Sequence, residues 1–156
     1  MTKDLDIHPL DELSVSGIAA LDEKISGTYS PETWEKRVMY YIRRDPEGSF
    51  VAESGGQLVG FMLGEVRSGE FGLERATGWI EVLGVDPDFR GQAIGRHLAE
   101  AMLSHFRERG VERVCTLVSE QREGLMRFFG ALGFEASDLR SLSLDLSPEP
   151  TSGESS

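Results

Sequence analysis

The chain has 156 residues, of which 39% are hydrophobic and 28% are charged, with a formal net charge of −11 and a single cysteine. These values predict one folded domain over residues 1–146 and a disordered tail, rich in Ser, Pro and Glu, over 147–156. They argue against a nucleic-acid ligand, which requires a basic surface, and against a membrane span, a signal peptide or an internal disulfide, so we expect a cytoplasmic protein.

The first half of the chain has the periodicity of a strand, two helices and a strand pair. Apolar and polar residues alternate in the strands and recur at helical spacing in the helices. Gly27 ends the first helix, Ser30 caps the second, and Pro31 takes its first position. The predicted elements are a strand over 5–9, a helix over 10–23, a helix that begins at Pro31, and strands over 50–53 and 58–66 joined by a hairpin.

The second half predicts a long strand, a helix, a strand, a helix and a last strand. In the first of these helices, apolar residues lie four apart from Ile94 onward, and Gly110 ends it. His97 and His105 fall on its charged side and are expected to face solvent. With His8 they lack metal-ligand spacing, so we predict no metal. The predicted bounds are 76–85, 94–109, 114–118, 122–132 and 139–146, the last with alternating leucines.

The most informative segment is the junction between the strand over 76–85 and the helix after it. Residues 82–95, V-L-G-V-D-P-D-F-R-G-Q-A-I-G, pass from an apolar strand through a turn into a helix with small residues at its start. A helix N-terminus offers unpaired backbone N–H groups and a partial positive charge. The junction therefore predicts an anion site suited to a pyrophosphate, without the Lys of a Walker A loop or a G-x-G-x-x-G fingerprint.

The same junction resembles the acyl-CoA-binding segment of the GNAT family of N-acetyltransferases. That pattern is Arg or Gln, two residues, Gly, one residue, then Gly or Ala, and Arg90 and Gly95 match its ends. Ala93 stands where the family usually has Gly, and we expect it in a right-handed αR conformation. Residues 127–134, R-F-F-G-A-L-G-F, are similar to the family's Tyr-Glu-Lys-x-Gly-Phe ending.

The resemblance covers residues 7–146 and implies a GNAT fold of the α/β (α+β) class, with a mixed, strongly twisted sheet of six to seven strands flanked by about four helices. It implies an enzyme that transfers acetyl from acetyl-CoA, its co-substrate, to a primary amine by direct attack in a ternary complex. The acceptor stays open between a protein N-terminus, a lysine and a small amine. The residues that would contact CoA are Leu83, Gly84 and Val85 for the pantetheine arm, and Arg90, Gly91, Gln92, Ala93, Ile94, Gly95 and Arg96 for the pyrophosphate.

The catalytic groups are expected on the same strand and on the last helix. Glu81 is the candidate base, acting through water, and strand alternation places its side chain on the same face as Leu83. Phe129 stands where many relatives carry a Tyr that protonates the leaving sulfur, so it would line the channel without giving a proton. Arg122 replaces a CoA-contacting Asn, and Glu23 and Tyr29 are candidates for binding a cationic acceptor.

Two other interpretations remain open from the sequence. One is a catalytically degenerate member that holds acyl-CoA as a sensor or scaffold, suggested by Phe129 and Arg122. The other is a homodimer in which the alternating segment 139–146 pairs at a sheet edge of a second copy. Trp34, Tyr40 and Tyr41, at helical spacing, are expected in the core.

Overall fold

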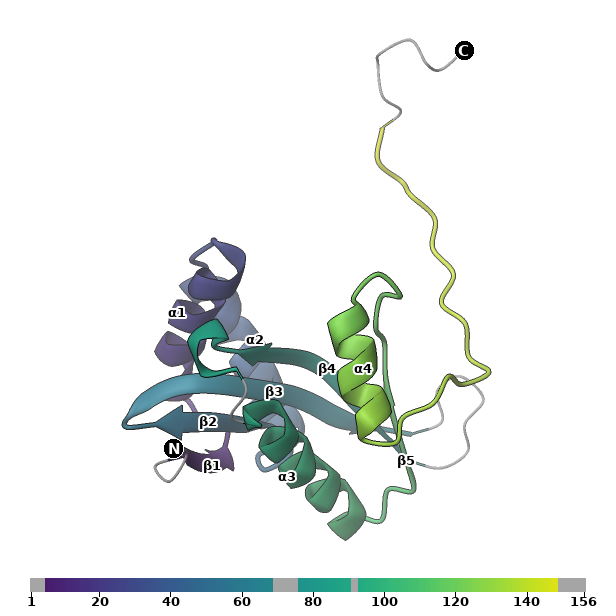
Figure 1. Cartoon of the computed structure of the whole chain (residues 1–156), viewed down its shortest axis with the longest axis horizontal. Helices are drawn as coiled ribbons and strands as arrows, with labels where there is room; N and C mark the ends of the chain where they lie inside the picture. Colours follow the sequence, from purple (N-terminus) through teal and green to yellow (C-terminus); the bar gives the residue numbers. More distant parts are fainter. Residues whose placement is uncertain (1–4, 69–75, 91–92, 149–156) are drawn as a thin grey trace.

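The computed structural model describes residues 5–68, 76–90 and 93–148, and its centre is a five-stranded sheet (Figure 1). The strand order is β1-β2-β3-β4-β5, with antiparallel pairing except between β4 and β5, which are parallel. In chain order the elements are β1 (Leu5–Pro9), α1 (Ser14–Ser26), α2 (Pro31–Arg44), β2 (Phe50–Ser54), β3 (Gln57–Arg67), β4 (Thr77–Val85), a 3-10 turn (Pro87–Phe89), α3 (Ile94–Glu108), β5 (Arg113–Thr116) and α4 (Glu123–Ala131).

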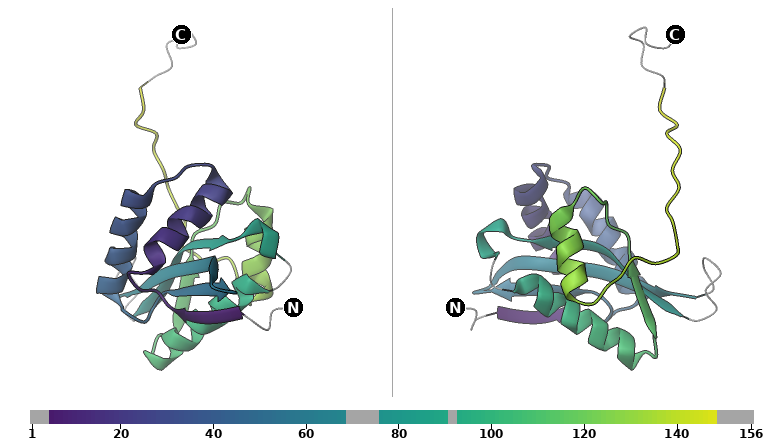
Figure 2. Two further views of the ribbon diagram at one scale, coloured as in Figure 1. Left: turned by 90° about the vertical axis from the view of Figure 1, so that its left-hand side faces the viewer. Right: turned by 45° about the vertical axis from the view of Figure 1, so that its right-hand side comes forward.

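Helices cover both faces of the sheet, and each face has its own hydrophobic core. Figure 2 shows α1 and α2 on one side and α3 and α4 on the other. Burial of these apolar side chains drives the packing, at roughly 1.5–3 kcal/mol for each large side chain. The α1/α2 core contains Ile18, Trp34, Val38, Val51, Phe61 and Leu63, and the α3/α4 core contains Met62, Ile80, Ile94, Leu98, Met102, Phe106 and Phe129.

A β-bulge interrupts the pairing of β3 and β4 at Glu81. Leu63 pairs with Val82 and Gly64 pairs with Ile80, so Glu81 is an extra residue on β4. The bulge turns both Glu81 and Val82 toward the α1/α2 face, where Glu81 contacts α2 and Val82 packs against the core. Leu83 packs against the α3/α4 core instead. The prediction that Glu81 and Leu83 share a face is therefore wrong, because the extra residue breaks the alternation.

The parallel ladder between β4 and β5 is short. It runs from the pair Thr77–Arg113 to the pair Ile80–Thr116 and ends there, whereas β4 continues to Val85. The last part of β4 stays paired with β3 on its other side. Among the described residues, the part of β4 beyond Ile80 therefore has no partner on β5.

The last predicted strand is not formed. Residues 139–146 are irregular in the structure, and Figures 1 and 2 show this segment leading away from the folded body. Leu142, Leu144 and Leu146 are between 81 and 87% exposed. The described sheet therefore has five strands rather than six to seven, because alternation makes a strand possible but only a paired neighbour forms it.

Three smaller predictions about side chains are also corrected. His105 is 9% exposed rather than solvent-facing, since its Nε2 lies 2.7 Å from Asp45 Oδ2 in the turn after α2. Ser30 is at the N-cap of α2, but among the described residues its side chain makes no capping hydrogen bond; its carbonyl accepts the amide of Trp34. Trp34 and Tyr41 are buried as expected, whereas Tyr40 is 46% exposed.

Within the described ranges, no helix has both the length and the apolar character needed to cross a bilayer.

The position opposite the bulge should tolerate no side chain. A Cβ on Gly64 would overlap the carbonyl oxygen of Trp79 and approach Met102 Cε to 2.7 Å. We expect Gly64→Ala to lower the free energy of unfolding by about 3 kcal/mol in urea titrations. Gly130→Ala in α4 is the control, because nothing lies within 4 Å of its added Cβ, and it should raise that free energy by about 0.5–1 kcal/mol. Equal stabilities for the two variants would contradict this packing.

Candidate active site

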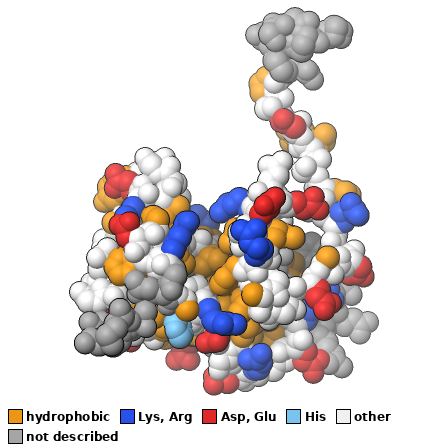
Figure 3. Space-filling view, in the orientation of Figure 1, with side chains coloured by type: hydrophobic (Ala, Val, Ile, Leu, Met, Phe, Trp, Pro, Cys, Tyr) orange, Lys and Arg blue, Asp and Glu red, His pale blue; other side chains and the backbone are white. Residues whose placement is uncertain are grey.

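A cleft of about 670 Å³ opens where the end of β4, the start of α3 and the side of α4 meet. Apolar side chains from all three elements line it, among them Leu83, Ile94 and Phe128. Three arginines, Arg90, Arg96 and Arg122, also line it. Figure 3 shows hydrophobic side chains in the middle of this view with Lys and Arg side chains around them. The cleft thus combines an apolar surface with positive charge, which suits a long ligand with anionic groups.

The start of α3 forms the polar end of this cleft. The first turn of α3 carries Arg96 and no acidic residue, so its unpaired amides and positive dipole end face no carboxylate of that turn. Ala93, Ile94, Gly95 and Arg96 all line the cleft. Gly91 and Gln92, which were predicted to contribute amides, lie outside the described residues.

Ala93 differs from the expectation of a right-handed conformation. It is the N-cap of α3 and has φ 60° and ψ 27°, in the left-handed region. This conformation is unfavourable for a residue with a Cβ and common for Gly. The family's usual Gly at this position therefore has a backbone reason here: the turn into α3 needs a positive φ, which Ala supplies at a cost.

The open end of β4 forms the other end of the cleft. Leu83, Gly84 and Val85 line it just beyond the last pair that β4 makes with β5. No strand in the described part of the chain pairs with this side of the segment. Because neighbouring strands normally satisfy backbone groups on both sides, this edge could pair with an extended ligand.

Phe129 is placed in the core rather than on the cleft wall. It is 5% exposed and makes edge contacts with Phe128 and Phe134, whose ring centroids lie 5.0 and 5.1 Å from its own. Phe128, one residue earlier on α4, lines the cleft instead. Adjacent helical residues point about 100° apart, so Phe128 faces the cleft while Phe129 packs into the core.

Glu81 lies on the α2-facing side of β4, opposite the side on which Leu83 packs, and its carboxylate accepts hydrogen bonds from two side chains. The hydroxyl of Tyr41 donates to its Oε1 at 2.8 Å, and the Arg67 guanidinium on β3 forms a close ion pair with its Oε2. The side chain of Glu81 is 24% exposed. Burial, followed by the hydrogen bond to Glu81, raises the pKa of Tyr41 far above its usual value, so this phenol remains a donor throughout the physiological pH range.

A second carboxylate, Glu65 on β3, also contacts Arg67 and is 1% exposed. It accepts hydrogen bonds from Tyr40, Arg44 and Arg67 at 2.8 to 3.0 Å. Burial alone would raise the pKa of Glu65, but the bonds from Tyr40 and Arg67 and the nearby positive charges outweigh it, so the pKa is lowered. Arg67 therefore bridges the two carboxylates.

Sequence reasoning missed this network. The one indication was Glu65 itself, a charged residue near the end of an apolar strand. Its partners Tyr40 and Arg44 become neighbours only when α2 packs across the sheet, so spacing along the chain could not identify them. Arg67, two residues further along β3, could have been found from strand alternation.

The two predicted acceptor residues lie near the end of α1. Glu23 is in its last turns, and Tyr29 follows in the loop, 58% exposed. Ile25, between them, lines the cleft. Lys24 fixes this part of α1 to the turn after β4 through ion pairs with Asp86 at 2.8 Å and Asp88 at 2.7 Å. The hydrogen bonds to Asp86 and then Asp88 raise the pKa of Lys24, so the link persists at neutral pH.

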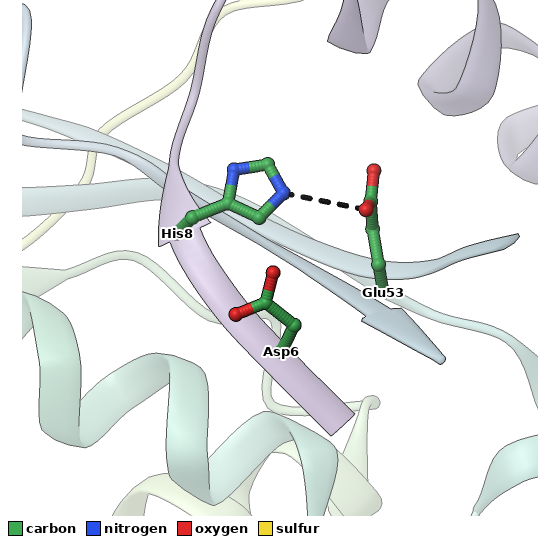
Figure 4. Close-up of side chains that lie close together, drawn as sticks. All are labelled: Asp6, His8 and Glu53. Atoms are coloured by element: carbon green, nitrogen blue, oxygen red, sulfur yellow. Dashed lines mark ion pairs between the residues drawn. The ribbon is translucent and has the colours of Figure 1, made fainter. Parts of the chain in front are cut away.

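A separate cluster on the far edge of the sheet contains Asp6 and His8 on β1 and Glu53 on β2 (Figure 4). Their ligand atoms lie within 4.8 Å of one another. His8 Nε2 is 3.6 Å from Glu53 Oε1, with side chains 30 and 37% exposed. We interpret it as a surface ion pair with an acidic neighbour, and it does not border the cleft.

The chain belongs to the acetyltransferase (GNAT) family, whose model matches residues 18–134. It is 41% identical over 122 residues to a mycothiol acetyltransferase of Thermobispora bispora, covering 78% of this chain and 41% of that protein. It is 30% identical over 112 residues to an uncharacterized N-acetyltransferase, MJ1207, of Methanocaldococcus jannaschii, covering 71% of this chain and 50% of that protein. The chain thus spans half or less of the length of these relatives.

Solved structures show the same fold. An aminoglycoside N-acetyltransferase, AAC(6')-Iy, in complex with CoA superposes with a TM-score of 0.78 at 18% identity, covering 92% of this chain and 95% of that one. Ard1 from Thermoplasma volcanium superposes with a TM-score of 0.72 at 22% identity, covering 86% of this chain and 84% of that one. The mixed sheet with helices on both faces is therefore the GNAT fold.

The left-handed Ala93 gives a prediction about stability. Ala93→Gly removes the unfavourable contact of its Cβ at positive φ, worth roughly 1–2 kcal/mol, against about 0.4–1 kcal/mol of added unfolded-state entropy. We expect a net gain of about 0.5–1 kcal/mol, seen as a Tm increase of a few degrees. Ala101→Gly, inside α3, is the matched control and should lower Tm. A lower Tm for Ala93→Gly would contradict the left-handed assignment.

Proposed function

We propose that this chain is an acetyl-CoA-dependent N-acetyltransferase that transfers the acetyl group to a primary amine by direct attack in a ternary complex. The observation that carries the proposal is the continuity of the cleft from the start of α3 to the open end of β4. The first end suits a pyrophosphate and the second suits an extended amide-bearing arm. We place this activity in the cytoplasm, where the single Cys115 would stay reduced.

CoA would bind along this path. The amides at residues 91–96 would hold the pyrophosphate, with Arg90, Arg96 and Arg122 supplying charge. The main chain of Leu83, Gly84 and Val85 would pair with the pantetheine arm, as an added strand does. One amide of this segment would then face the thioester oxygen and stabilise the negative charge that develops there.

The chemistry requires a neutral amine and a route for its proton. The nitrogen lone pair attacks the thioester carbonyl carbon, the C–N bond forms and the C–S bond breaks. Glu81 takes the proton of the attacking nitrogen through water. The sulfur leaves as thiolate, which a thiol pKa near 8.5 allows without a tyrosine on α4. The products are the acetylated amine and CoA.

The acceptor would approach from the end of α1. Glu23 and Tyr29 lie in this region, close along the chain to Ile25 on the cleft wall. The relatives with 41% identity or similar include mycothiol acetyltransferases. A protein N-terminus, a lysine or a small amine could each be the acceptor at this end of the cleft.

The proposal is tested by thermal shift and by release of free thiol from acetyl-CoA. We expect CoA and acetyl-CoA to raise Tm, because ligand at 100 to 1,000 times Kd adds about 3–4 kcal/mol to the free energy of unfolding. Pantetheine, which lacks the pyrophosphate, should raise it much less, and Arg122→Gln should reduce the CoA effect but not the pantetheine effect. Thiol release should occur with at least one amine of a panel, and Glu81→Gln should lower kcat about 100-fold.

The competing interpretation, an acyl-CoA sensor or scaffold, makes a different prediction for the same assay. It is favoured by the buried, hydroxyl-free Phe129, which leaves that position of α4 without a proton donor. Stabilisation by acetyl-CoA with no thiol release across the panel would support it. The absence of stabilisation by any ligand would overturn both.

We also propose that two copies of this chain associate through the segment 139–146. β5 is the last strand of the described sheet, and its Val114, Cys115 and Thr116 are only half-buried. The segment begins beside it, since Asp138 Oδ1 lies 3.9 Å from Arg113 Nη2. Beyond this point the leucines are exposed. The segment of a second copy would add a strand to β5 and bury these leucines, at roughly 1.5–3 kcal/mol each.

Light scattering after size exclusion tests this association. We expect a dimer at micromolar concentration that Leu144→Asp converts to a monomer, because a charge would be buried in the new interface. Ser143→Asp, on the alternate face of the segment, is the control and should leave the dimer intact. A monomeric parent chain would contradict the proposal and point to pairing within one chain.

A further inference from the structure

The charges around Glu81 cancel among the described residues. Two carboxylates, Glu65 and Glu81, face two guanidiniums, Arg44 and Arg67, and each carboxylate is in direct contact with at least one of them. The whole chain carries a net charge of −11, so this neutrality is a local property. An acceptor ammonium that reached Glu81 would find a carboxylate whose charge is already balanced.

Arg67 is held firmly in this arrangement. It pairs with both carboxylates, and its guanidinium carbon lies 5.5 Å from the ring centroid of Trp79. An incoming ammonium would have to displace, with a single hydrated charge, a partly buried guanidinium whose Nη2 contacts both carboxylates, which is unfavourable. The pair is therefore expected to persist when the acceptor binds.

The hydroxyl of Tyr41 donates a hydrogen bond to the other carboxylate oxygen of Glu81, and this bond is expected to persist. Its phenol donates to Oε1 at 2.8 Å and stays protonated, as burial and this hydrogen bond require. One further charged group of α2 acts on Tyr41, Arg37, and it is also positive. The described surroundings thus offer an ammonium ion no unpaired negative partner at Glu81.

We propose that the acceptor is a weakly basic primary amine with a pKa near 8, such as a peptide α-amine, which enters as the neutral base. This inference rests on the proposed acetyltransferase function. Glu81 then receives the proton after C–N bond formation, when the nitrogen has become strongly acidic, rather than extracting it from a stable ammonium beforehand. Strongly basic amines, such as lysine side chains and polyamines, are disfavoured because they arrive charged.

The expected selectivity follows from the fraction of each amine that is neutral. At pH 7.5 about a quarter of a peptide α-amine is unprotonated, against about one in a thousand lysine side chains. Without an enzyme group that compensates for this, kcat/KM should favour the α-amine by about 200-fold. For each acceptor, kcat/KM should rise with pH and level off once the pH exceeds the pKa of that amine.

The experiment compares two sets of matched acceptors by thiol release: short peptides with a free α-amine and no lysine, and the same peptides acetylated at the N-terminus with one lysine. Arg67→Gln should release Glu81 to bind ammonium and reduce the α-amine preference at least tenfold. Arg67→Lys, which keeps the charge, should retain most of it. Arg43→Gln, which removes an exposed arginine of the same helix outside this network, is the control and should leave the ratio within twofold.

The outcomes separate this inference from the function on which it rests. Transfer to lysine peptides as fast as to α-amine peptides by the parent chain would overturn the acceptor assignment and leave the acetyltransferase intact. An unchanged ratio in Arg67→Gln, in a variant that CoA still stabilises, would overturn the role of Arg67. Acetyl-CoA binding without thiol release from either set would overturn the proposed function and the inference together.

Discussion

The bulge at Glu81 is the constraint on which the rest of the site depends. One extra residue in β4, opposite Gly64, places Glu81 on the α2 face while the next residues return to regular pairing with β3. Bulges increase the local twist of a strand, and the ladder between β4 and β5 ends at the residue before this one. A single irregularity in the sheet thus coincides with two features: a carboxylate on one face and an open strand edge on the other side of it.

The two cores keep this irregularity in place. Met62 and Ile80 pack toward α3, and Phe61 and Leu63 pack toward α1 and α2, so a shift of register on either strand would expose buried side chains on both faces. Gly64 lets the backbone of β4 approach closely at this point. The ion pairs of Lys24 with Asp86 and Asp88 then connect α1 to the turn that leads into α3. The cleft is therefore bounded by β4, which is paired with β3, and by a turn that is tied to α1.

Much of the fold was accessible from the sequence because local patterns there agree with the tertiary structure. The order of helices and strands through residue 132 follows the periodicities, and the strand-to-helix junction at Arg90 to Gly95 forms one end of the cleft. The errors have a common physical origin. The segment 139–146 has the alternation of a strand, yet no strand pairs with it in the described structure. Ala93, taken as right-handed, shows that composition does not fix a dihedral angle at a cap. His105, placed with solvent by its helical position, is covered by a turn that is 60 residues away in the chain.

By itself, the sequence determined the secondary structure of most of the chain, the strand-to-helix junction that lines the cleft, and the family, because these depend on residues close together along the chain. Only the tertiary structure decided which face Glu81 occupies and which groups surround it. Tyr41 and Arg67 reach that carboxylate from α2 and β3, at separations of 40 and 14 residues. Contacts of this kind arise from helix packing and strand register, which are set by the burial of both faces of the sheet at once. The local charge balance, and with it the expected class of acceptor, is therefore a property of the folded chain rather than of any segment of it.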